Sequence, residues 1–199
     1  MYLSKLTLNP VNKQVLAQLS NIYELHRTLC AAFPKDRDAE RLLFRVDEGQ
    51  NSYTVLVQSI EKPDWSLINE KNDFFLTPPE QKQFLPKVAD GQLLAFKLRA
   101  NPTMKKAGKR IGLIKEEDRL NWLRRKAGNG GFDFVQLQTI PAGIVKTQKA
   151  DKIISFYSVT FQGILKVTDR AKFTETLAHG IGSGKGLGFG LLSVAPYKD

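Results

Sequence analysis

The amino-acid sequence predicts an α+β protein in which one order of elements (strand, helix, strand, strand, helix, strand) occurs twice. Short runs of alternating apolar and polar residues indicate strands, and longer stretches with apolar residues three and four positions apart indicate helices. Gly, Pro, Asn and Asp separate these segments and mark the turns. This order is typical of a ferredoxin-like βαββαβ unit. We therefore predict two tandem ferredoxin-like domains, residues 1–100 and 101–199.

The first domain is expected to begin with an alternating strand, Tyr2 to Leu8, which Asn9-Pro10 ends. A helical pattern follows from Val11 to Ala32. Asn21, with Glu24 three positions later, resembles a capping box, so this region is expected to contain two helices with the second starting at Asn21.

The remainder of the first domain is less regular. Two β-rich runs joined by a polar turn predict a hairpin. The stretch 60–91 contains four prolines and has no clear periodicity, apart from a short helical segment. The elements expected here are two hairpin strands, a short helix and a last strand: Arg41–Asp47, Tyr53–Ser59, Asp64–Asn69 and Gln92–Ala100.

The second domain follows the same order more loosely. Asp169 is a suitable N-cap for its second helix, because a short carboxylate accepts hydrogen bonds from the first free backbone amides. The elements expected are a basic segment, a helix, two strands, a helix and a strand: Thr103–Ile114, Glu116–Lys126, Phe132–Ile140, Ile154–Val167, Asp169–Ala178 and Gly190–Ala195.

Positive charge is concentrated in one part of the chain. The net charge is +10, and the window from Lys97 to Lys126 holds eleven basic and three acidic residues. Such a concentration is typical of a surface that binds a polyanion, because neutralising phosphates supplies most sequence-independent affinity for nucleic acids. A solvated cationic face and a membrane-surface patch are the alternatives. The absence of an apolar helix face or lipidation motif beside the charge makes the membrane alternative weaker.

Other features of the composition limit the class of protein. A single cysteine, Cys30, excludes a disulfide framework and favours a reducing compartment. No apolar run reaches the ~20 residues of a membrane span, and the N-terminus lacks the apolar core of a signal peptide. We expect a cytoplasmic protein with no membrane partner.

The helix around residues 21–29 holds the best candidates for acid–base chemistry. Histidine is the side chain whose ordinary pKa lies closest to neutral pH, and His26 follows Tyr23 by three positions, so the two share a helix face. Arg27 lies on a neighbouring face and could bind a phosphate through two hydrogen bonds. His26 also falls on the apolar stripe of the helix, where a histidine is often structural. His179, the other histidine, follows a helix and is expected to interact with that helix's C-terminus.

Six glycines occupy alternate positions from Gly180 to Gly190. The run does not have the spacing of a Walker A or a dinucleotide-binding motif, and it precedes a strand where both motifs require a helix. Glycines allow backbone amides to approach phosphates, and Lys185 adds a charge. A flexible or packing loop is the alternative interpretation.

The sequence holds no arrangement typical of a metal site or of another cofactor. Two histidines and one cysteine, far apart in sequence, cannot form a zinc site of ordinary spacing. We expect no metal and no cofactor. If the protein cuts nucleic acid, the nucleophile must then come from the substrate, as the 2′-hydroxyl of RNA does.

Four segments together resemble the CasE family of CRISPR-associated repeat-RNA endoribonucleases, which belong to the Cascade surveillance complex. These are the opening MYLSKL, the helix YELHRTL followed by AAFP, the strand end KLRANP with its basic loop, and the terminal GIGSGKGLGFGLLSVAP. The resemblance implies two ferredoxin-like domains and metal-independent cleavage of precursor CRISPR RNA at the 3′ base of the repeat hairpin. Attack by the 2′-hydroxyl would leave a 2′,3′-cyclic phosphate and a 5′-hydroxyl. The partners implied are the repeat hairpin and other Cascade subunits.

The same resemblance implies roles for individual residues. His26 would protonate the 5′-oxygen or take part in base catalysis, and Tyr23 would orient the 2′-hydroxyl or help to deprotonate it. The residues expected to bind RNA lie on the catalytic helix, in the basic segment and in the glycine run: Arg27, Arg99, Asn101, Lys105, Lys106, Lys109, Arg110, Lys115, Gly182, Lys185 and Gly188.

Two other functions stay open at this point. A non-catalytic RNA-binding assembly subunit would use the same fold and leave Tyr23 and His26 as core residues. A nucleotide-binding enzyme is disfavoured by the spacing of the glycines. Whether Lys146, Lys149 and Lys152 form a second RNA surface is also open.

Overall fold

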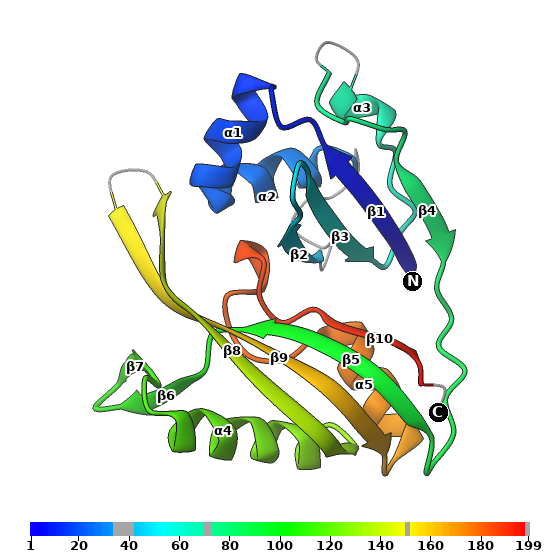
Figure 1. Ribbon diagram of the computed structural model, residues 1–199, viewed down its shortest axis with the longest axis vertical. Coiled ribbons are helices and arrows are strands. Elements are labelled where there is room, and N and C mark those ends of the chain that lie inside the picture. Colours follow the sequence, from blue (N-terminus) through cyan, green and yellow to red (C-terminus); the bar gives the residue numbers. More distant parts are fainter. Residues whose placement is uncertain (34–41, 70–72, 150–151, 198–199) are drawn as a thin grey trace. The chain divides into compact units, whose positions relative to one another are not determined.

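A computed structural model describes residues 1–33, 42–69, 73–149 and 152–197. The chain divides into two compact units. The first comprises Met1–Leu85, Lys146–Ile154 and Lys185–Gly188, and the second comprises Pro86–Val145, Ser155–Gly184 and Phe189–Asp199. Each unit contains a four-stranded sheet and helices (Figure 1).

The sheet of the first unit has the strand order β2-β3-β1-β4. All three pairings are antiparallel, and Leu6 of β1 lies opposite Val55 of β3. With the helices between strands one and two and between strands three and four, this is the ferredoxin-like topology that was expected. The elements are β1 (Tyr2–Leu8), α1 (Lys13–Ser20), α2 (Ile22–Cys30), β2 (Leu43–Glu48), β3 (Tyr53–Ser59), α3 (Ser66–Asn69) and β4 (Glu80–Gln83).

The core of the first unit lies between α1, α2 and one face of this sheet. Val15 of α1 and Leu25 and Leu29 of α2 are fully buried against Leu6 and Phe44 of the strands. These helical residues recur with the spacing of one helix face, which explains why the predicted apolar stripe folds inward.

The second unit repeats the topology. Its strand order is β10-β5-β9-β8, and β5 pairs antiparallel with both β9 and β10. The elements are β5 (Leu93–Ala100), β6 (Thr103–Lys106), β7 (Lys109–Gly112), α4 (Glu116–Asn129), β8 (Phe132–Lys149), β9 (Lys152–Val167), α5 (Arg170–His179), the short 3₁₀ helix η1 (Lys185–Leu187) and β10 (Leu192–Pro196). Of these, η1, the end of β8 and the start of β9 belong to the first unit.

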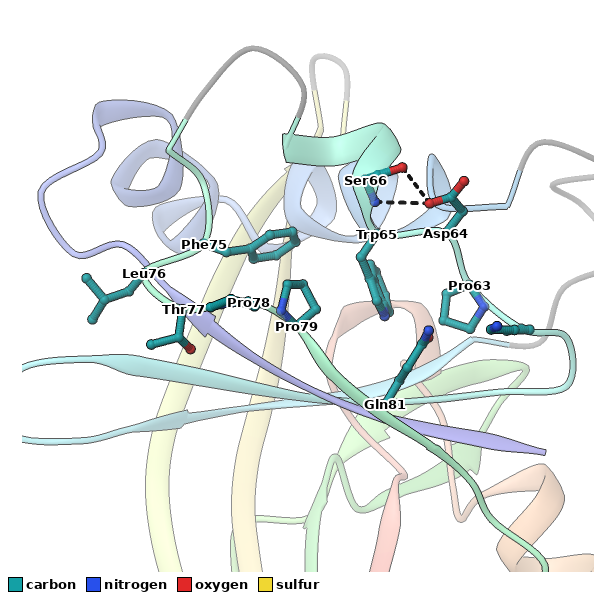
Figure 2. A pocket seen from close by; sticks show the side chains of 11 residues that line it. Pro63, Asp64, Trp65, Ser66, Phe75, Leu76, Thr77, Pro78, Pro79 and Gln81 are labelled. Carbon is teal, nitrogen blue, oxygen red and sulfur yellow. Dashed lines mark hydrogen bonds between the residues drawn. The ribbon is translucent and has the colours of Figure 1, made fainter.

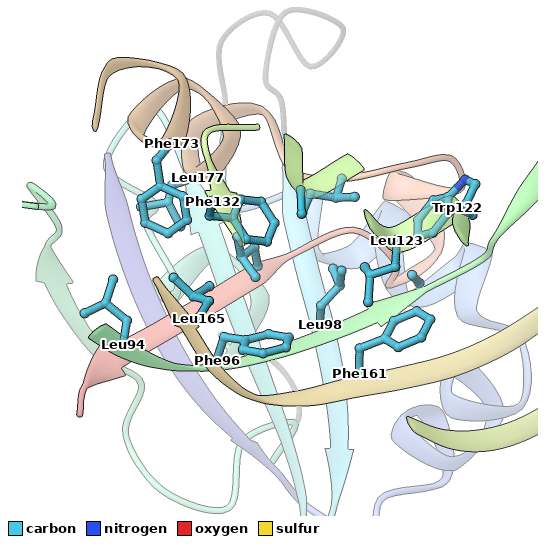
Figure 3. Close-up of a cluster of buried hydrophobic side chains, with 14 of the residues drawn as sticks. Leu94, Phe96, Leu98, Trp122, Leu123, Phe132, Phe161, Leu165, Phe173 and Leu177 are labelled. Carbon is cyan, nitrogen blue, oxygen red and sulfur yellow. The ribbon is translucent and has the colours of Figure 1, made fainter. Parts of the chain in front are cut away.

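Aromatic and aliphatic side chains from α4, α5 and the sheet form the second core (Figure 3). Leu94, Phe96 and Leu98 alternate with more exposed residues along β5 and point into this core, opposite Leu123 and Phe173 of the two helices. The alternation seen in the sequence therefore reflects one buried face of β5.

One strand belongs to a different sheet from the one expected. We predicted residues 92–100 as the last strand of the first domain, with a boundary at residue 100. In the structure this strand is β5, an inner strand of the second sheet, and the compact units divide between Leu85 and Pro86. The first sheet is completed by β4, which is short and whose four residues are all exposed, so it carries no apolar alternation in the sequence.

The helix ends agree with the sequence in one case and differ in another. The Asp169 side chain accepts hydrogen bonds from the amides of Ala171 and Lys172, which confirms the predicted N-cap of α5. The division into two helices at Asn21 is also confirmed, but the capping box is wrong, because the Asn21 side chain caps nothing in α2. Arg41, the first residue of the predicted hairpin strand, lies outside the described residues.

Candidate functional site

Helix α2 presents its polar face next to its buried stripe. Ile22, Leu25 and Leu29 are buried, whereas Tyr23 and His26 are half-buried at the border of the stripe. The helix therefore holds both candidates rigidly while leaving part of each side chain accessible. His26 is thus not fully enclosed in the core, and its catalytic role stays a prediction.

Burial sets the ionisation of His26. Desolvation lowers its pKa from the ordinary value of 6.5, because removing water from the ring disfavours the charged form. The ring of Phe44 stacks beside the imidazole, with 6.0 Å between centroids and 27° between planes. In the protein without substrate, His26 is accordingly neutral at neutral pH.

The sulfur of Cys30, one helical turn further, lies within 4 Å of both nitrogens of this ring. Its Sγ atom lies 3.6 Å from Nε2 and 3.9 Å from Nδ1 of His26. Within the described part of the chain, no carboxylate or carbonyl oxygen bonds to the imidazole. This differs from the usual arrangement, in which a hydrogen bond to the second ring nitrogen fixes the orientation of a functional histidine.

Tyr23 is fixed by contacts with the end of β8. Its backbone amide donates to Thr147 Oγ1 at 3.2 Å. Thr147 in turn donates to Asn21 Oδ1 at 2.6 Å, and the amide of Gln148 donates to the same oxygen at 3.2 Å. The Asn21 side chain thus ties β8 to the start of α2, which is why it does not cap the helix.

This connection also places a cation beside Tyr23. Lys149 Nζ lies 5.3 Å from the centre of the Tyr23 ring, within the range of a cation–π contact. Of the three lysines left open by the sequence, Lys149 therefore has a defined position next to a candidate catalytic group.

Arg27 has an intrahelical partner. Its Nη1 atom lies 2.9 Å from Glu24 Oε2, and its side chain is 65% exposed. An exposed pair of this kind contributes little stability and exchanges readily for another anion. Arg27 is consequently accessible for the predicted contact with a phosphate.

The glycine run is packed more closely than a free phosphate-binding loop would be. A Cβ atom at Gly182 would lie 3.0 Å from the Trp122 ring, and one at Gly188 would lie 3.4 Å from the Phe44 ring. Both glycines also have positive φ, which other residues rarely adopt. Packing therefore explains these two glycines, and their predicted contact with RNA stays a prediction. Lys185 begins η1, whose Leu187 packs against the core of the first unit.

The basic segment forms a separate hairpin in the second unit. Strands β6 and β7 pair with each other, and Lys106 lies opposite Lys109. Five predicted RNA-binding residues are exposed here, four in the hairpin and Lys115 just after it, as expected of a surface that binds phosphates: Lys105, Lys106, Lys109, Arg110 and Lys115.

Two other predicted RNA-binding residues are less accessible. Asn101 is only 5% exposed, so its side chain offers little surface to an RNA in this structure. Arg99 donates to Ser158 Oγ and lies over the ring of Phe189. Arg119, which sequence reasoning did not single out, is buried beneath the hairpin and donates to the Ile114 carbonyl and to the Tyr157 hydroxyl.

A pocket of about 810 Å³ in the first unit contains none of these residues (Figure 2). It is lined by Pro63, Trp65, Phe75 and Pro79, among others, and the Asp64 carboxylate in its wall accepts hydrogen bonds from Ser66. Among the described residues, no three His, Cys, Asp or Glu side chains gather as a metal site would require. No helix in the described part of the chain is long and apolar enough to cross a membrane.

Comparison with known proteins gives matches along the whole chain. The profile of a family described as CRISPR associated protein matches residues 1–196. The CRISPR-associated endoribonuclease Cse3 of Thermus thermophilus is 37% identical, with 98% of this chain and all of that protein covered. The CRISPR system Cascade subunit CasE of Escherichia coli is 31% identical with the same coverage.

The solved structures agree with these matches. Thermus thermophilus Cse3 bound to an RNA that represents a pre-cleavage complex has a TM-score of 0.89 and 36% identity, with 98% of each chain covered. Cas6e of Escherichia coli has a TM-score of 0.75 and 28% identity, with 99% of this chain and all of that chain covered. The chain therefore belongs to the family of CRISPR-associated proteins that includes Cse3 and CasE.

Proposed function

We propose that this protein is a cytoplasmic endoribonuclease that cleaves precursor CRISPR RNA at the 3′ base of the repeat hairpin, without a metal ion, and stays bound to the product. One observation carries the proposal. His26 is half-buried with a lowered pKa on the same helix as Tyr23, in a chain that is similar over its whole length to proteins named as CRISPR-associated endoribonucleases.

The chemistry proposed is an internal transesterification. The 2′-hydroxyl oxygen bonds to phosphorus and gives its proton to a solvent water, the P–O5′ bond breaks, and the leaving 5′-oxygen takes a proton from the protonated His26 imidazole. The products are a 2′,3′-cyclic phosphate and a 5′-hydroxyl. Tyr23 orients the 2′-hydroxyl, and Lys149 lies where a cation can stabilise charge on the phosphate.

Binding is assigned to the basic residues. The exposed cations of the β6–β7 hairpin contact the phosphates of the RNA stem, whose deep and narrow major groove gives side chains little access to bases. Arg27 exchanges Glu24 for a phosphate near the scissile bond. Because one relative is named as a Cascade subunit, other Cascade subunits are the proposed protein partners.

The deciding experiment incubates the protein with a repeat hairpin in EDTA and identifies the ends produced by mass spectrometry. Wild type is expected to give a cyclic phosphate, and His26→Ala to cleave at least 100-fold more slowly because general acid catalysis typically contributes 10²–10⁴-fold. His179→Ala is the matched control, since His179 bonds only within α5, and it should cleave like wild type.

A substrate with a 2′-deoxy group at the scissile nucleotide separates the mechanism from the activity. It should bind with unchanged affinity and resist cleavage, since the internal nucleophile is missing. Cleavage of the deoxy substrate would exclude attack by the 2′-hydroxyl. Tight hairpin binding by wild type with no product at any pH would favour the non-catalytic assembly subunit instead.

A further inference from the structure

The orientation of His26 is unexplained by hydrogen bonding, because no described oxygen bonds to its ring. A proton donor must nevertheless point in one direction, since the proton is transferred along the plane of the imidazole. The surroundings of the two ring faces give the explanation. On one side lies the position that a Cβ atom of Gly186 would occupy, and on the other lies the sulfur of Cys30.

The missing side chain of Gly186 would lie against one face of the ring. A Cβ atom at this glycine would be 3.3 Å from Nε2, 3.5 Å from Cε1 and 3.6 Å from Cδ2 of His26. These nearly equal distances place that position above the ring at Nε2. An atom in the ring plane, along the Nε2 lone pair, would be much farther from the two flanking carbons than from the nitrogen.

The Cys30 sulfur lies against the other face. Its distances of 3.6 and 3.9 Å to the two ring nitrogens are too similar for a hydrogen bond along either lone pair, and an in-plane position between the nitrogens would overlap Cε1. It cannot share the face of Gly186, because the three atoms nearest to the Cβ position there all belong to the imidazole.

We propose that Gly186 and Cys30 clamp the two faces of the His26 ring and that Gly186 must lack a side chain for this purpose. The φ angle of Gly186 is not positive, unlike that of its neighbours Gly184 and Gly188, so the backbone conformation alone would accept alanine. Space against His26 is what requires glycine. Gly186 is therefore a positioning residue.

This inference rests on the proposed function of His26 but can be tested apart from it. In Gly186→Ala the new methyl would press on the imidazole, which must shift by a few tenths of an ångström toward Cys30. We expect the cleavage rate at saturating protein to fall roughly 10- to 100-fold, since small misplacements of a reacting group have effects of this size. Binding of the 2′-deoxy hairpin should be unchanged.

Gly128→Ala is the matched control. Gly128 lies in α4 without a positive φ, and nothing approaches the position of its Cβ atom. This variant should cleave like wild type. Equal cleavage by Gly186→Ala would overturn the clamp, and so would a parallel loss of hairpin affinity, which would make Gly186 an RNA contact.

One further measurement does not depend on cleavage at all. Diethylpyrocarbonate acylates accessible neutral imidazoles, and the chain has only two histidines. Gly186→Ala should slow the acylation of His26 at least threefold relative to His179, as followed by peptide mass spectrometry. An unchanged ratio would refute the contact even if the protein proves to be no nuclease.

Cys30→Ala tests the opposite face. Combined with Gly186→Ala, it removes the atom toward which the ring is pushed, so the double variant should cleave several-fold faster than Gly186→Ala alone. If the fold-loss in cleavage rate of the double variant equals the product of the losses in the two single variants, the residues do not act on one ring. That result would contradict the proposal.

Discussion

At the scale of the residue, His26 combines a lowered pKa with an orientation fixed by packing. Burial beside Phe44 makes the neutral ring the stable form in the free protein. A general acid must be protonated when it acts, so the charge has to come with the substrate. An RNA phosphate near Nε2 would supply it, because a neighbouring negative charge favours the imidazolium.

This gives a prediction about titration. In the free protein, the His26 ring protons followed by NMR should titrate with a midpoint below 6.5, since desolvation lowers the pKa. Saturation with the 2′-deoxy hairpin should raise the midpoint. His179, whose bonds lie within α5, provides the internal control. A His26 midpoint that falls further on RNA binding would argue against a general acid and for a base.

The lowered pKa of His26 also determines how the free energy of unfolding changes with pH. A histidine with a lowered pKa in the folded state binds protons more weakly there than in the unfolded chain, so its contribution becomes unfavourable as the pH falls through about 6.5. In His26→Gln, the free energy of unfolding should therefore decrease less between pH 8 and pH 5 than in wild type. A steeper decrease in the variant would contradict a lowered pKa.

At the scale of the element, the end of β8 is attached to the first turn of α2. Three hydrogen bonds connect Asn21, Tyr23, Thr147 and Gln148. Thr147 is only 3% exposed, so the two bonds that it makes are partly shielded from water. The attachment fixes the start of the helix that bears Tyr23 and His26, and it holds Lys149 over the Tyr23 ring.

Thr147→Val should loosen this attachment without changing side-chain volume much. The Tyr23 amide loses its partner, at a cost of about 1–3 kcal/mol for a buried unsatisfied group, whereas Asn21 Oδ1 keeps the Gln148 amide. Hydrogen exchange at the Tyr23 amide should accelerate roughly 5- to 100-fold, and cleavage should slow with it. Thr174→Val, at an exposed position of α5, is the control. Unchanged protection of Tyr23 would show that Thr147 does not hold the helix.

At the scale of the whole molecule, one topology occurs twice with different additions. The first unit carries Tyr23 and His26 on its helix between strands one and two. In the second unit, the β6–β7 hairpin is inserted between the first strand and the first helix, and it presents four cations. The proposed catalytic residues and the proposed phosphate-binding cations thus lie on different copies of the fold.

Because the hairpin cations and the proposed catalytic residues lie in different units, we expect substitutions in the hairpin to change RNA binding but not the cleavage step. Replacing Lys105, Lys106, Lys109 and Arg110 with alanine should weaken hairpin binding and reduce its dependence on salt, because fewer counterions are released on binding. The cleavage rate of the bound complex should stay within a few-fold of wild type. A matched loss of four charges from the first unit (Lys5, Lys13, Lys62 and Lys82) should affect binding less. Equal effects of the two variants would move the RNA-binding surface away from the hairpin.

Much of the fold could be predicted because local pattern and tertiary burial agree. The alternation along β5 and the stripe of α2 reflect real buried faces, and Asp169 caps α5 through its own side chain. The prediction failed where an element has no buried face of its own. All four residues of β4 are exposed, so only pairing with β1 defines it as a strand, and β5 was assigned to the wrong sheet as a result.

The sequence by itself determined the chemical inventory: one histidine beside a tyrosine on a helix, one concentrated block of cations and one glycine run. Only the tertiary structure decided how the histidine is held. Thr147 lies 124 residues from Tyr23 along the chain, and Gly186 is farther still from His26, so no local spacing could reveal either contact. The physical reason is that packing between residues distant in sequence leaves no periodic pattern. The only trace of the contact with His26 is a glycine at position 186, whose φ angle is not positive and therefore did not require glycine.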